Sequence, residues 1–350
     1  MTKVDYIIVG QGLAGSAVTQ TLLAKGMDVM VIDEARPNQA SRIASGIWNP
    51  VVLKRMKKVW QADAMIPALQ LFYSQTEELF KTHIKDNAKV NRLFASNKEV
   101  DEWLLLCDNP AFDGLLNSEI KKNKNANLTI NYGLGEVTAS GRIDTNAWLN
   151  AVRQFLRRKG MLMEEAFLWD ELQYDSKSIG YKNTQAQGII FCEGMYTSQN
   201  NPFFKNLPFA LTKGEVITIH CPDLNLNTII NSSVFILPLG NELYKVGATY
   251  SWNDLDDTPT EKALKELLDK ARKVIKVPFK VIEHQAGIRP TVKDRKPLLG
   301  THKDYKNIHI FNGMGSRGVL MAPWLATRFV DYLENNTALP PETDINRFEY

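Results

Sequence analysis

A glycine-rich turn near the N-terminus constrains the fold more than any other feature of this sequence. An apolar run at residues 6–9 leads into Gly-Gln-Gly-Leu-Ala-Gly at residues 10–15, and apolar residues with helical spacing follow to residue 25. A second apolar run, residues 29–32, ends on Asp33 and Glu34. This order of strand, glycine turn, helix, strand and acid is the one that a dinucleotide-binding unit requires.

Each part of this unit has a physical reason. Gly10 permits the sharp turn, Gly12 lacks a Cβ and lets a pyrophosphate approach the backbone, and Gly15 lets the helix pack closely on the sheet. The N–H groups and the dipole at the helix start stabilise the negative phosphates. Asp33 is expected to accept hydrogen bonds from a ribose. Glu34 is the weaker candidate, because the next side chain along a strand points to the other face.

Composition indicates an ordinary globular enzyme. The chain has 350 residues and a formal net charge of +3, which does not by itself imply a polyanionic partner. The three cysteines, Cys107, Cys192 and Cys221, lie far apart without metal-binding spacing, so we expect a reducing compartment and no metal site. No signal peptide and no stretch long enough to span a membrane is recognisable, so a cytoplasmic location without membrane contact is expected.

The remaining pattern predicts mixed secondary structure. Residues 62–124 have largely helical spacing, and an amphipathic helix follows Asp144 and ends at Gly160. Another helix is expected over residues 260–275. Strands are expected at residues 187–192, 216–219, 234–237, 244–249 and 308–311.

A second glycine cluster, Asn-Gly-Met-Gly-Ser-Arg-Gly at residues 312–318, again lies between an apolar strand and a helix. It predicts a second helix N-terminus that can stabilise negative charge. A nicotinamide enzyme rarely needs one so far along the chain. An elongated cofactor with a pyrophosphate at one end and a ring that becomes anionic on reduction needs both, so these two clusters favour FAD over NAD.

Several ordered motifs together resemble the D-amino-acid-oxidase-type family of FAD-dependent oxidoreductases, and the resemblance covers nearly the whole chain. Besides the glycine turn with Asp33, they are Ala-Ser-Gly at 44–46, Cys-Glu-Gly at 192–194, Lys-Gly-Glu at 213–215, Gly-Ala-Thr at 247–249, Gly-Ile-Arg-Pro at 287–290 and the cluster at 313–318. Each motif is weak alone, but their order and spacing are specific.

The resemblance implies an α/β plus α+β fold with two domains. A Rossmann-like FAD-binding domain with a central parallel sheet would use residues 1–60, 140–205 and 285–350, and a substrate domain on a large antiparallel sheet would use 61–139 and 206–284. It also implies oxidation of the C–N bond of a small carboxylated amine or amino acid, by hydride transfer to flavin N5, to an imine that hydrolyses. No cysteine stands where the family attaches flavin covalently, so non-covalent FAD is expected.

The resemblance also assigns site residues. Arg289 matches the family position that binds a substrate carboxylate, which a planar guanidinium suits. Arg317 would lie over the flavin pyrimidine edge or the substrate. The alternatives are a structural salt bridge for Arg289 and a surface helix cap for Arg317. Phe235 stands where relatives often have a tyrosine, which leaves simple amino-acid specificity open.

Arg289 and Arg317 are therefore the catalytic candidates, and Arg289, Phe235, Tyr250 and Trp48 are the substrate-binding candidates. The residues expected to bind FAD are Gly10, Gly12, Leu13, Ala14, Gly15, Asp33, Glu34, Arg42, Ala44, Ser45, Gly46, Gly194, Gly313, Gly315, Ser316, Arg317, Gly318 and Val319.

A narrower resemblance indicates an alternative function. Residues 44–50, 201–204 and 313–324 are similar to the FAD domain of the bifunctional enzyme that matures the tRNA wobble uridine, which oxidises a carboxymethylamino group. Two basic runs, at residues 54–58 and 153–159, could contact RNA, but solvated surfaces are the favoured interpretation for both. The expected partners are a small amine and oxygen or another electron acceptor, with tRNA less favoured.

Overall fold

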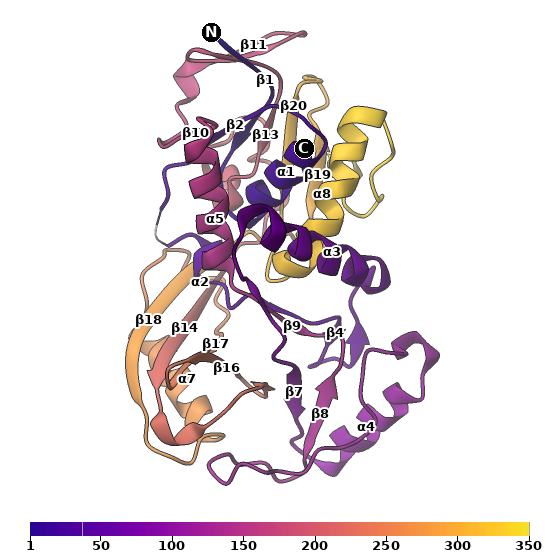
Figure 1. Ribbon diagram of the computed structural model, residues 1–350, viewed down its shortest axis with the longest axis vertical. Helices are drawn as coiled ribbons and strands as arrows, with labels where there is room; N and C mark the ends of the chain where they lie inside the picture. Colours follow the sequence, from indigo (N-terminus) through magenta and orange to yellow (C-terminus); the bar gives the residue numbers. More distant parts are fainter. Residues whose placement is uncertain (37, 350) are drawn as a thin grey trace.

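The first apolar runs are neighbouring strands of an eight-stranded sheet in the computed structural model, which describes residues 1–36 and 38–349. Its parallel strands run in the order β10 (Leu162–Met163), β2 (Val29–Ile32), β1 (Thr2–Val9), β13 (Thr184–Phe191) and β20 (Ile308–Asn312). Three antiparallel strands complete it: β11 (Leu172–Tyr174), β12 (Ile179–Tyr181) and β19 (Leu298–Thr301). This sheet occupies the upper part of Figure 1.

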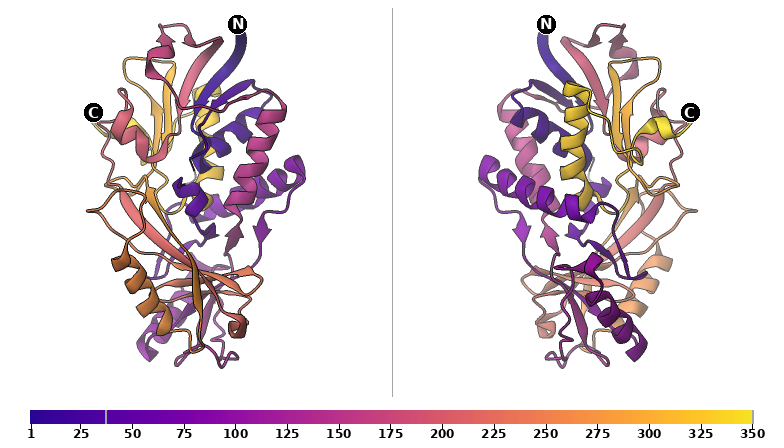
Figure 2. Two further views of the ribbon diagram at one scale, coloured as in Figure 1. Left: turned by 90° about the vertical axis from the view of Figure 1, so that its left-hand side faces the viewer. Right: turned by 90° about the vertical axis from the view of Figure 1, so that its right-hand side faces the viewer.

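Both faces of this sheet are buried, as continuous apolar strands predict. Tyr6 and Ile8 belong to a core shared with α1 (Leu13–Ala24), α5 (Thr145–Arg158) and α8 (Gly318–Asn335), whereas Ile7 and Val9 belong to a second core on the opposite face. The alternation follows from the two-residue period of a strand. Figure 2 shows these helices together on one side of the sheet.

A second sheet, of seven strands among the described residues, forms the lower part of Figure 1. Its order is β18 (Lys280–Arg289), β14 (Thr212–His220), β17 (Leu243–Gly247), β16 (Phe235–Gly240), β15 (Ile229–Asn231), β7 (Val90–Leu93) and β8 (Leu134–Val137). All neighbours are antiparallel except β15 and β7. The helix α7 (Glu261–Arg272) packs on β14 and β17, and the two sheets confirm the α/β plus α+β fold class.

The stretch predicted as helical over residues 62–124 is only partly so. It contains α3 (Ala62–Phe80) and α4 (Asn97–Cys107), but β6 (Lys85–Asp86) and β7 lie between them. The strand β7 is four residues long and is defined by partners more than 40 residues away, so local spacing does not show it. In addition, α3 packs against α8 beside the first sheet, although the resemblance implies that its residues belong to the substrate domain. The boundaries between the FAD-binding and substrate domains stay a prediction.

Short elements connect the two sheets. They are α2 (Ala40–Ile43), α6 (Thr197–Asn200), β3 (Ile47–Trp48), β4 (Val51–Val52), β5 (Lys57–Lys58), β9 (Gly141–Ile143) and 3-10 turns at Pro110–Phe112, Trp169–Glu171, Gly194–Tyr196, Pro222–Leu224 and Ile345–Arg347. Across the described part of the chain, no helix has the length and apolar character that crossing a bilayer requires.

Candidate functional site

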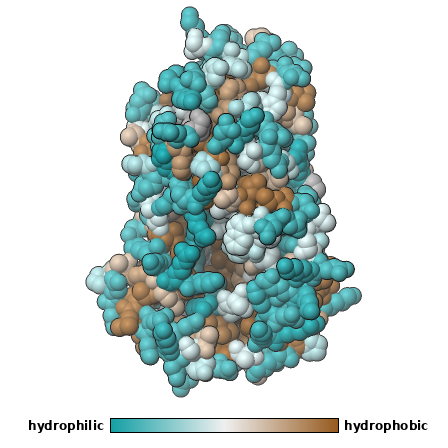
Figure 3. Space-filling model, turned by 180° about the vertical axis from the view of Figure 1, so that it is seen from behind, coloured by the Kyte–Doolittle hydropathy of each residue, from teal (hydrophilic) through white to brown (hydrophobic). Residues whose placement is uncertain are grey.

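A cavity of about 1270 Å³ lies where the two sheets meet. The ends of β1, β2 and β20 line it from one side, at Val9, Ile32 and Asn312, and residues of the second sheet, including Phe235 and Arg289, line it from the other. The carboxyl ends of parallel strands are where open α/β sheets bind ligands. Seen from behind, the molecule is hollowed near mid-height, with hydrophobic residues visible at depth (Figure 3).

The first glycine turn separates structural from ligand-facing positions. Gly10 has a φ of 97°, and a Cβ there would lie 2.7 Å from the Cys192 carbonyl oxygen. At Gly15 a Cβ would lie 1.8 Å from the Gly10 carbonyl oxygen, so both residues are required by the fold itself. At Gly12 a Cβ would meet only the Ser41 hydroxyl, at 3.2 Å, and the residue lines the cavity. Gly12 is thus open to a ligand.

Neither helix that begins at the cavity is capped by the side chain of its own N-cap residue. Neither α1 nor α8 has a side-chain cap from its N-cap residue or an acid in its first turn. By contrast α4, α5 and α7 are capped by Ser96, Asp144 and Thr260. Helix starts without such a cap leave N–H donors and a positive dipole end for an anion, so both helix starts suit negative groups, although the Leu13 N–H of α1 already donates to Ser41 Oγ.

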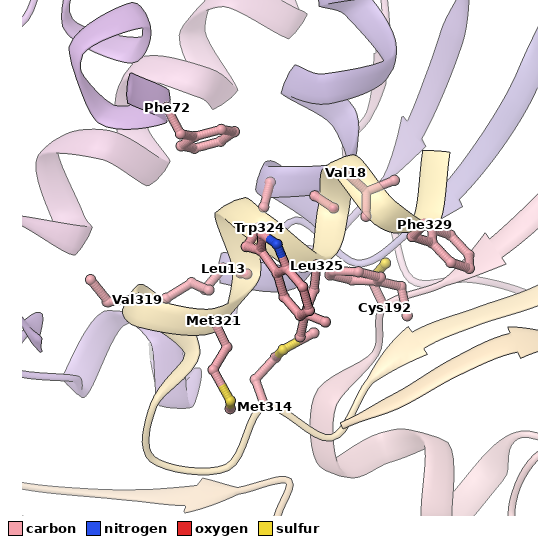
Figure 4. Packing of buried hydrophobic residues seen from close by; sticks show 14 of the residues in the cluster. Leu13, Val18, Phe72, Cys192, Met314, Val319, Met321, Trp324, Leu325 and Phe329 are labelled. Atoms are coloured by element: carbon pink, nitrogen blue, oxygen red, sulfur yellow. The ribbon is translucent and has the colours of Figure 1, made fainter. Parts of the chain in front are cut away.

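The two helix starts lie next to each other. A Cβ on Gly318 would be 3.0 Å from Leu13 Cδ2, so the two glycine clusters, about 300 residues apart in sequence, share one wall of the cavity. Figure 4 shows Leu13 of α1 packed in the same cluster as Val319 and Trp324 of α8. A single elongated ligand can therefore reach both clusters.

The acid after β2 is held by a buried network. Asp33 accepts hydrogen bonds from the Gln11 backbone N–H at 2.9 Å, the Ala35 N–H at 2.8 Å and Arg153 Nη1 at 2.8 Å. Arg153 is only 6% exposed, which corrects its interpretation as part of a solvated basic surface. It lies four residues after the buried Leu149, so its helical position could have indicated the buried face.

The fourth donor to Asp33 is the Gln39 amide, at a longer 3.3 Å. The Gln39 Oε1 atom is buried without a hydrogen-bond partner among the described residues, and Gln39 lines the cavity. A carboxylate accepts about four hydrogen bonds, so a ribose hydroxyl would have to replace the weak Gln39 contact. The same hydroxyl pair could then satisfy the Gln39 oxygen, so this corner fits a ribose.

Arg289, the last residue of β18, has no acidic partner in the described structure. Its guanidinium donates weakly to the backbone carbonyls of Lys213 and Thr249, at 3.3 to 3.4 Å, and lies over the Tyr250 ring with Cζ 4.3 Å from the ring centroid. Burial lowers the pKa of Arg289 from its usual value. Gly214 makes room for it, since a Cβ there would lie 1.9 Å from Arg289 Nη2.

Arg317 is the N-cap residue of α8 and also lines the cavity. Its guanidinium has no ion-pair partner within residues 1–36 and 38–349. Burial lowers its pKa, Tyr250 acts in the opposite direction, and the charges of Arg295 and Arg55 lower it further. Phe235 and Tyr250 line the same cavity.

Most of the expected cofactor residues line the cavity: Gly10, Gly12, Leu13, Ala14, Asp33, Glu34, Ala44, Ser45, Gly46, Gly194, Gly313, Gly315, Ser316, Arg317, Gly318 and Val319. Two cofactor candidates, Gly15 and Arg42, and one substrate-binding candidate, Trp48, do not line it. Gly15 acts through packing, as described above. Arg42 donates to Asn150 Oδ1 at 2.9 Å on the outside of α5. Trp48 is 6% exposed in the core, because its neighbour Ile47 faces the cavity and β3 therefore turns Trp48 the other way.

Several features of the site escaped sequence reasoning. Ser41 accepts a hydrogen bond from the Leu13 N–H at 2.9 Å, and Glu34 pairs with Arg36. Glu193 lines the cavity and accepts from Asn201 at 2.8 Å and Thr197 at 3.2 Å. Burial raises the pKa of Glu193 to about 7, against these hydrogen bonds. Among these features only Glu193 had a sequence signal, because it belongs to the Cys-Glu-Gly motif at residues 192–194.

Two adjacent helix starts without an N-cap side chain, an acid beside the unsatisfied Gln39 oxygen and an arginine without an acidic partner among the described residues fit a flavin-type dinucleotide oxidoreductase. The chain belongs to the D-amino-acid-oxidase (DAO) family, described as FAD dependent oxidoreductase, whose model matches residues 5–332. The resemblance in sequence and the assignment of FAD as the cofactor are thereby confirmed.

Individual relatives are distant. The glycine oxidase of Bacillus subtilis strain 168 is 29% identical over 157 residues, covering 43% of this chain and 42% of that protein. The bifunctional protein MnmC of Marinobacter nauticus, named for tRNA 5-methylaminomethyl-2-thiouridine biosynthesis, is 19% identical over 93% of this chain and 54% of its own length. The chain thus spans about half or less of each of these two relatives.

Solved structures share the fold. Glycine oxidase from Geobacillus kaustophilus superposes with a TM-score of 0.80 at 18% identity, over 97% of both chains. Iminodiacetate oxidase from Chelativorans sp. BNC1 gives 0.79 at 17% identity, over 97% of this chain and 99% of that one. At these identities the likeness establishes the architecture alone.

Proposed function

We propose that the protein oxidises the C–N bond of a small carboxylated amine or amino acid to an imine, which water then hydrolyses. Bound FAD, held without a covalent link, supplies the two-electron acceptor. The chain's own residues bind the amine, orient it and exclude water. The relatives named as glycine and iminodiacetate oxidases support this substrate class, because both names denote amines that carry carboxylates.

The observation that carries this proposal is the state of Arg289. A largely covered guanidinium that pairs with no carboxylate of the described chain is unfavourable unless a ligand supplies the anion. Its fork geometry suits two parallel hydrogen bonds to a carboxylate. The Tyr250 ring below it and Gly214 beside it fix the guanidinium in place without occupying its donors.

The remaining residues have separate tasks in this proposal. Gly12, the α1 start and Asp33 hold the adenosine and pyrophosphate half of FAD, and the α8 start with Arg317 stabilises charge on the ring half. With the amine bound in its neutral form, no protein base is required, so catalysis depends on positioning and on flavin electrostatics.

Replacing Arg289 tests the proposal directly. In Arg289→Met protein that retains FAD, the KM for glycine, sarcosine, proline or a D-amino acid that reduces the wild-type flavin should rise about 30- to 1000-fold, as expected for loss of a bidentate carboxylate contact. Anaerobic bleaching of the flavin absorbance is the measurement. The exposed Arg272 of α7 is the matched control, and Arg272→Met should leave KM unchanged.

Two outcomes would contradict the proposed function or the role of Arg289. If the FAD-loaded wild-type protein is not reduced by any carboxylated amine in such a set, the small-substrate function is wrong. If reduction occurs but Arg289→Met leaves KM within twofold of wild type, the carboxylate is bound elsewhere.

A further inference from the structure

A loop between β17 and α7, residues 250–257, runs along the cavity, and we call it the strap. Five of its residues line the cavity: Tyr250, Trp252, Leu255, Asp256 and Asp257. Three of these, Tyr250, Trp252 and Leu255, are large hydrophobic side chains that are exposed to water. A ligand in the cavity would cover part of this hydrophobic surface, so the strap is placed to contact whatever binds there.

The two ends of the strap reach two different parts of the site. At one end the Tyr250 ring lies beside Arg289, with Cζ 4.3 Å from the ring centroid. At the other end Asp257 Oδ2 accepts a hydrogen bond from Asn38 Nδ2 at 3.1 Å. Asn38 lines the cavity and precedes Gln39, whose unsatisfied oxygen belongs to the corner that fits a ribose. The strap thus connects the candidate substrate arginine with the candidate cofactor corner.

The middle of the strap is held by a buried lysine of β14. Lys213 Nζ donates to Asp254 Oδ2 at 3.0 Å and to Asp256 Oδ1 at 2.7 Å. The lysine side chain is 1% exposed, whereas those of the two aspartates are 45% and 60% exposed. Burial acts to lower the pKa of Lys213, but its hydrogen bonds to the aspartates raise it above the usual value. Moving the strap away would leave this ammonium buried without a partner, which is unfavourable.

Lys213 holds the strap from the far face of β14. Thr212, Gly214 and Val216 line the cavity, whereas Lys213 and Glu215 do not. Successive side chains of a strand point to opposite faces, so Lys213 and Glu215 point away from the ligand. Any influence of Lys213 on the site must therefore pass through the strap.

The two flanks of the strap have separate anchors. The Glu215 N–H donates to Thr249 Oγ1 at 2.9 Å, and the Glu215 carboxylate accepts from the Thr260 N–H at 2.7 Å and hydroxyl at 2.9 Å. The backbones of Lys213 and Ser251 exchange two hydrogen bonds, of 2.8 and 3.0 Å. These contacts do not involve the Lys213 ammonium, so that group acts specifically on the segment between Ser251 and Thr260.

We propose that Lys213 is a positioning residue, which holds the strap against the cavity through Asp254 and Asp256 and thereby controls both the release of FAD and the binding of substrate. The effect on substrate rests on the proposed function, whereas the effect on FAD does not depend on which amine is oxidised. Because Lys213 faces away from the cavity, the reaction step itself should not depend on it.

Hydrogen exchange and FAD release test the strap without turnover. Lys213→Met places an apolar side chain in the buried position and cannot bind the two aspartates. In the apoprotein, amide exchange in residues 252–257 should accelerate at least tenfold. FAD should dissociate at least fivefold faster, as measured by flavin fluorescence after dilution of the loaded protein. The control is Lys270→Met, which removes the partner of Glu266 on α7 away from the cavity and should change neither rate.

The aspartates provide a second set of variants at exposed positions. Asp254→Asn combined with Asp256→Asn removes both negative charges, and an asparagine at 256 can still accept the hydrogen bond that the Thr258 N–H gives to Asp256 Oδ1 at 2.9 Å. This double variant should also release FAD at least fivefold faster. Adding Lys213→Met to it should change the rate by less than twofold, because the three residues act through one interaction.

Substrate kinetics separate positioning from chemistry. With a carboxylated amine that reduces the wild-type flavin, Lys213→Met should raise KM about three- to thirtyfold. The limiting rate of anaerobic flavin reduction should stay within twofold of wild type, as expected for a residue that affects binding and not the reaction step. Lys270→Met should match the wild type in both quantities.

Three results would overturn this inference. The first is a Lys213→Met protein whose global unfolding is easier but whose strap exchange and FAD release are unchanged, since Lys213 would then be purely structural. The second is a lower limiting rate with an unchanged KM. The third is fully additive effects of the lysine and aspartate variants. If no carboxylated amine reduces the flavin, the proposed function fails, and the exchange and release measurements still decide whether Lys213 holds the strap.

Discussion

At the scale of single residues, the site depends on glycines, which have no side chain, as much as on residues with functional groups. Gly214 carries no functional group, yet its lack of a Cβ is what admits the Arg289 guanidinium between β14 and the Tyr250 ring. The sequence motif Lys-Gly-Glu is conspicuous, but its reason is visible only when β14 and β18 are paired with Thr212 opposite Arg289.

Adding one methyl group at Gly214 should therefore impair substrate binding. A Cβ would lie 1.9 to 2.3 Å from three guanidinium atoms of Arg289, so Gly214→Ala must displace that side chain. We expect KM for a carboxylated amine to rise at least tenfold while FAD is retained, as measured by flavin reduction. Gly180→Ala is the matched control, because its Cβ would make only an ordinary contact, at 3.5 Å from Gln173. An unchanged KM in Gly214→Ala would contradict the placement of Arg289.

Glu193 should make stability depend on pH. Burial raises its pKa in the folded protein to about 7, above the ordinary value of 4.5, so the folded state favours the protonated acid. The stabilising effect is complete below pH 4.5 and is lost as the pH rises through 7. Glu193→Gln, which resembles the protonated acid, should raise the unfolding free energy at pH 8 by about 1–3 kcal/mol.

The measurement is chemical denaturation of the apoprotein at pH 5 and pH 8. The difference between Glu193→Gln and wild type should shrink toward pH 5, where the wild-type acid is protonated. An exposed acid such as Glu261 provides the control, because Glu261→Gln should show no such trend. A constant difference at both pH values would mean that Glu193 does not titrate in this range.

At the scale of elements, two strand–turn–helix units form the wall of the cavity where the cofactor is proposed to bind. The start of α1 and the start of α8 lie at the carboxyl ends of β1 and β20, and neither has a cap from its N-cap side chain, whereas α4, α5 and α7 are capped and α3 carries Asp63 in its first turn. Backbone N–H donors thus remain at the two helix starts where the cofactor is proposed to bind. Within the first glycine motif, Gly12 and Gly15 have different roles, because Gly12 faces the cavity and Gly15 packs against the Gly10 backbone.

Alanine at these two positions should separate function from folding. Gly12→Ala has space for its Cβ apart from the Ser41 hydroxyl, so the apoprotein should lose less than about 1 kcal/mol while the affinity for FAD falls at least tenfold. Gly15→Ala places a Cβ 1.8 Å from the Gly10 carbonyl oxygen and should cost about 3 kcal/mol or more. Apoprotein unfolding and fluorescence titration with FAD distinguish them. Equal losses of stability would show that Gly12 is also a packing residue.

Sequence patterns predicted these units well because their signals are local. The first unit, the α5 segment capped by Asp144 and ended by Gly160, and α8 all occur where spacing and punctuation place them. The failures are tertiary. The strand β7 exists only through its pairing with β15 and β8, Arg153 is buried by its ion pair with Asp33, and Trp48 points away because of the pleat of β3.

At the scale of the whole molecule, the chain brings its two ends to one cavity. Residues 10–15 and 313–318 come from opposite ends of the sequence, and strands β1, β13 and β20 carry them to the same edge of the first sheet. The second sheet forms the opposite wall and contributes Arg289 through the long strand β18. A ligand that reaches both clusters should consequently couple the two ends of the chain.

Hydrogen exchange with whole and half cofactors tests this coupling. Because FAD should contact both helix starts, saturating FAD should slow amide exchange at least tenfold in residues 10–16 and in residues 313–319. ADP carries the pyrophosphate half alone, so it should protect residues 10–16 much more than 313–319. Residues 261–272 of α7, on the far side of the second sheet, should not respond to either ligand. If FAD protected only residues 10–16, the second glycine cluster would have no part in binding the cofactor, and the role assigned to the α8 start would have to be abandoned.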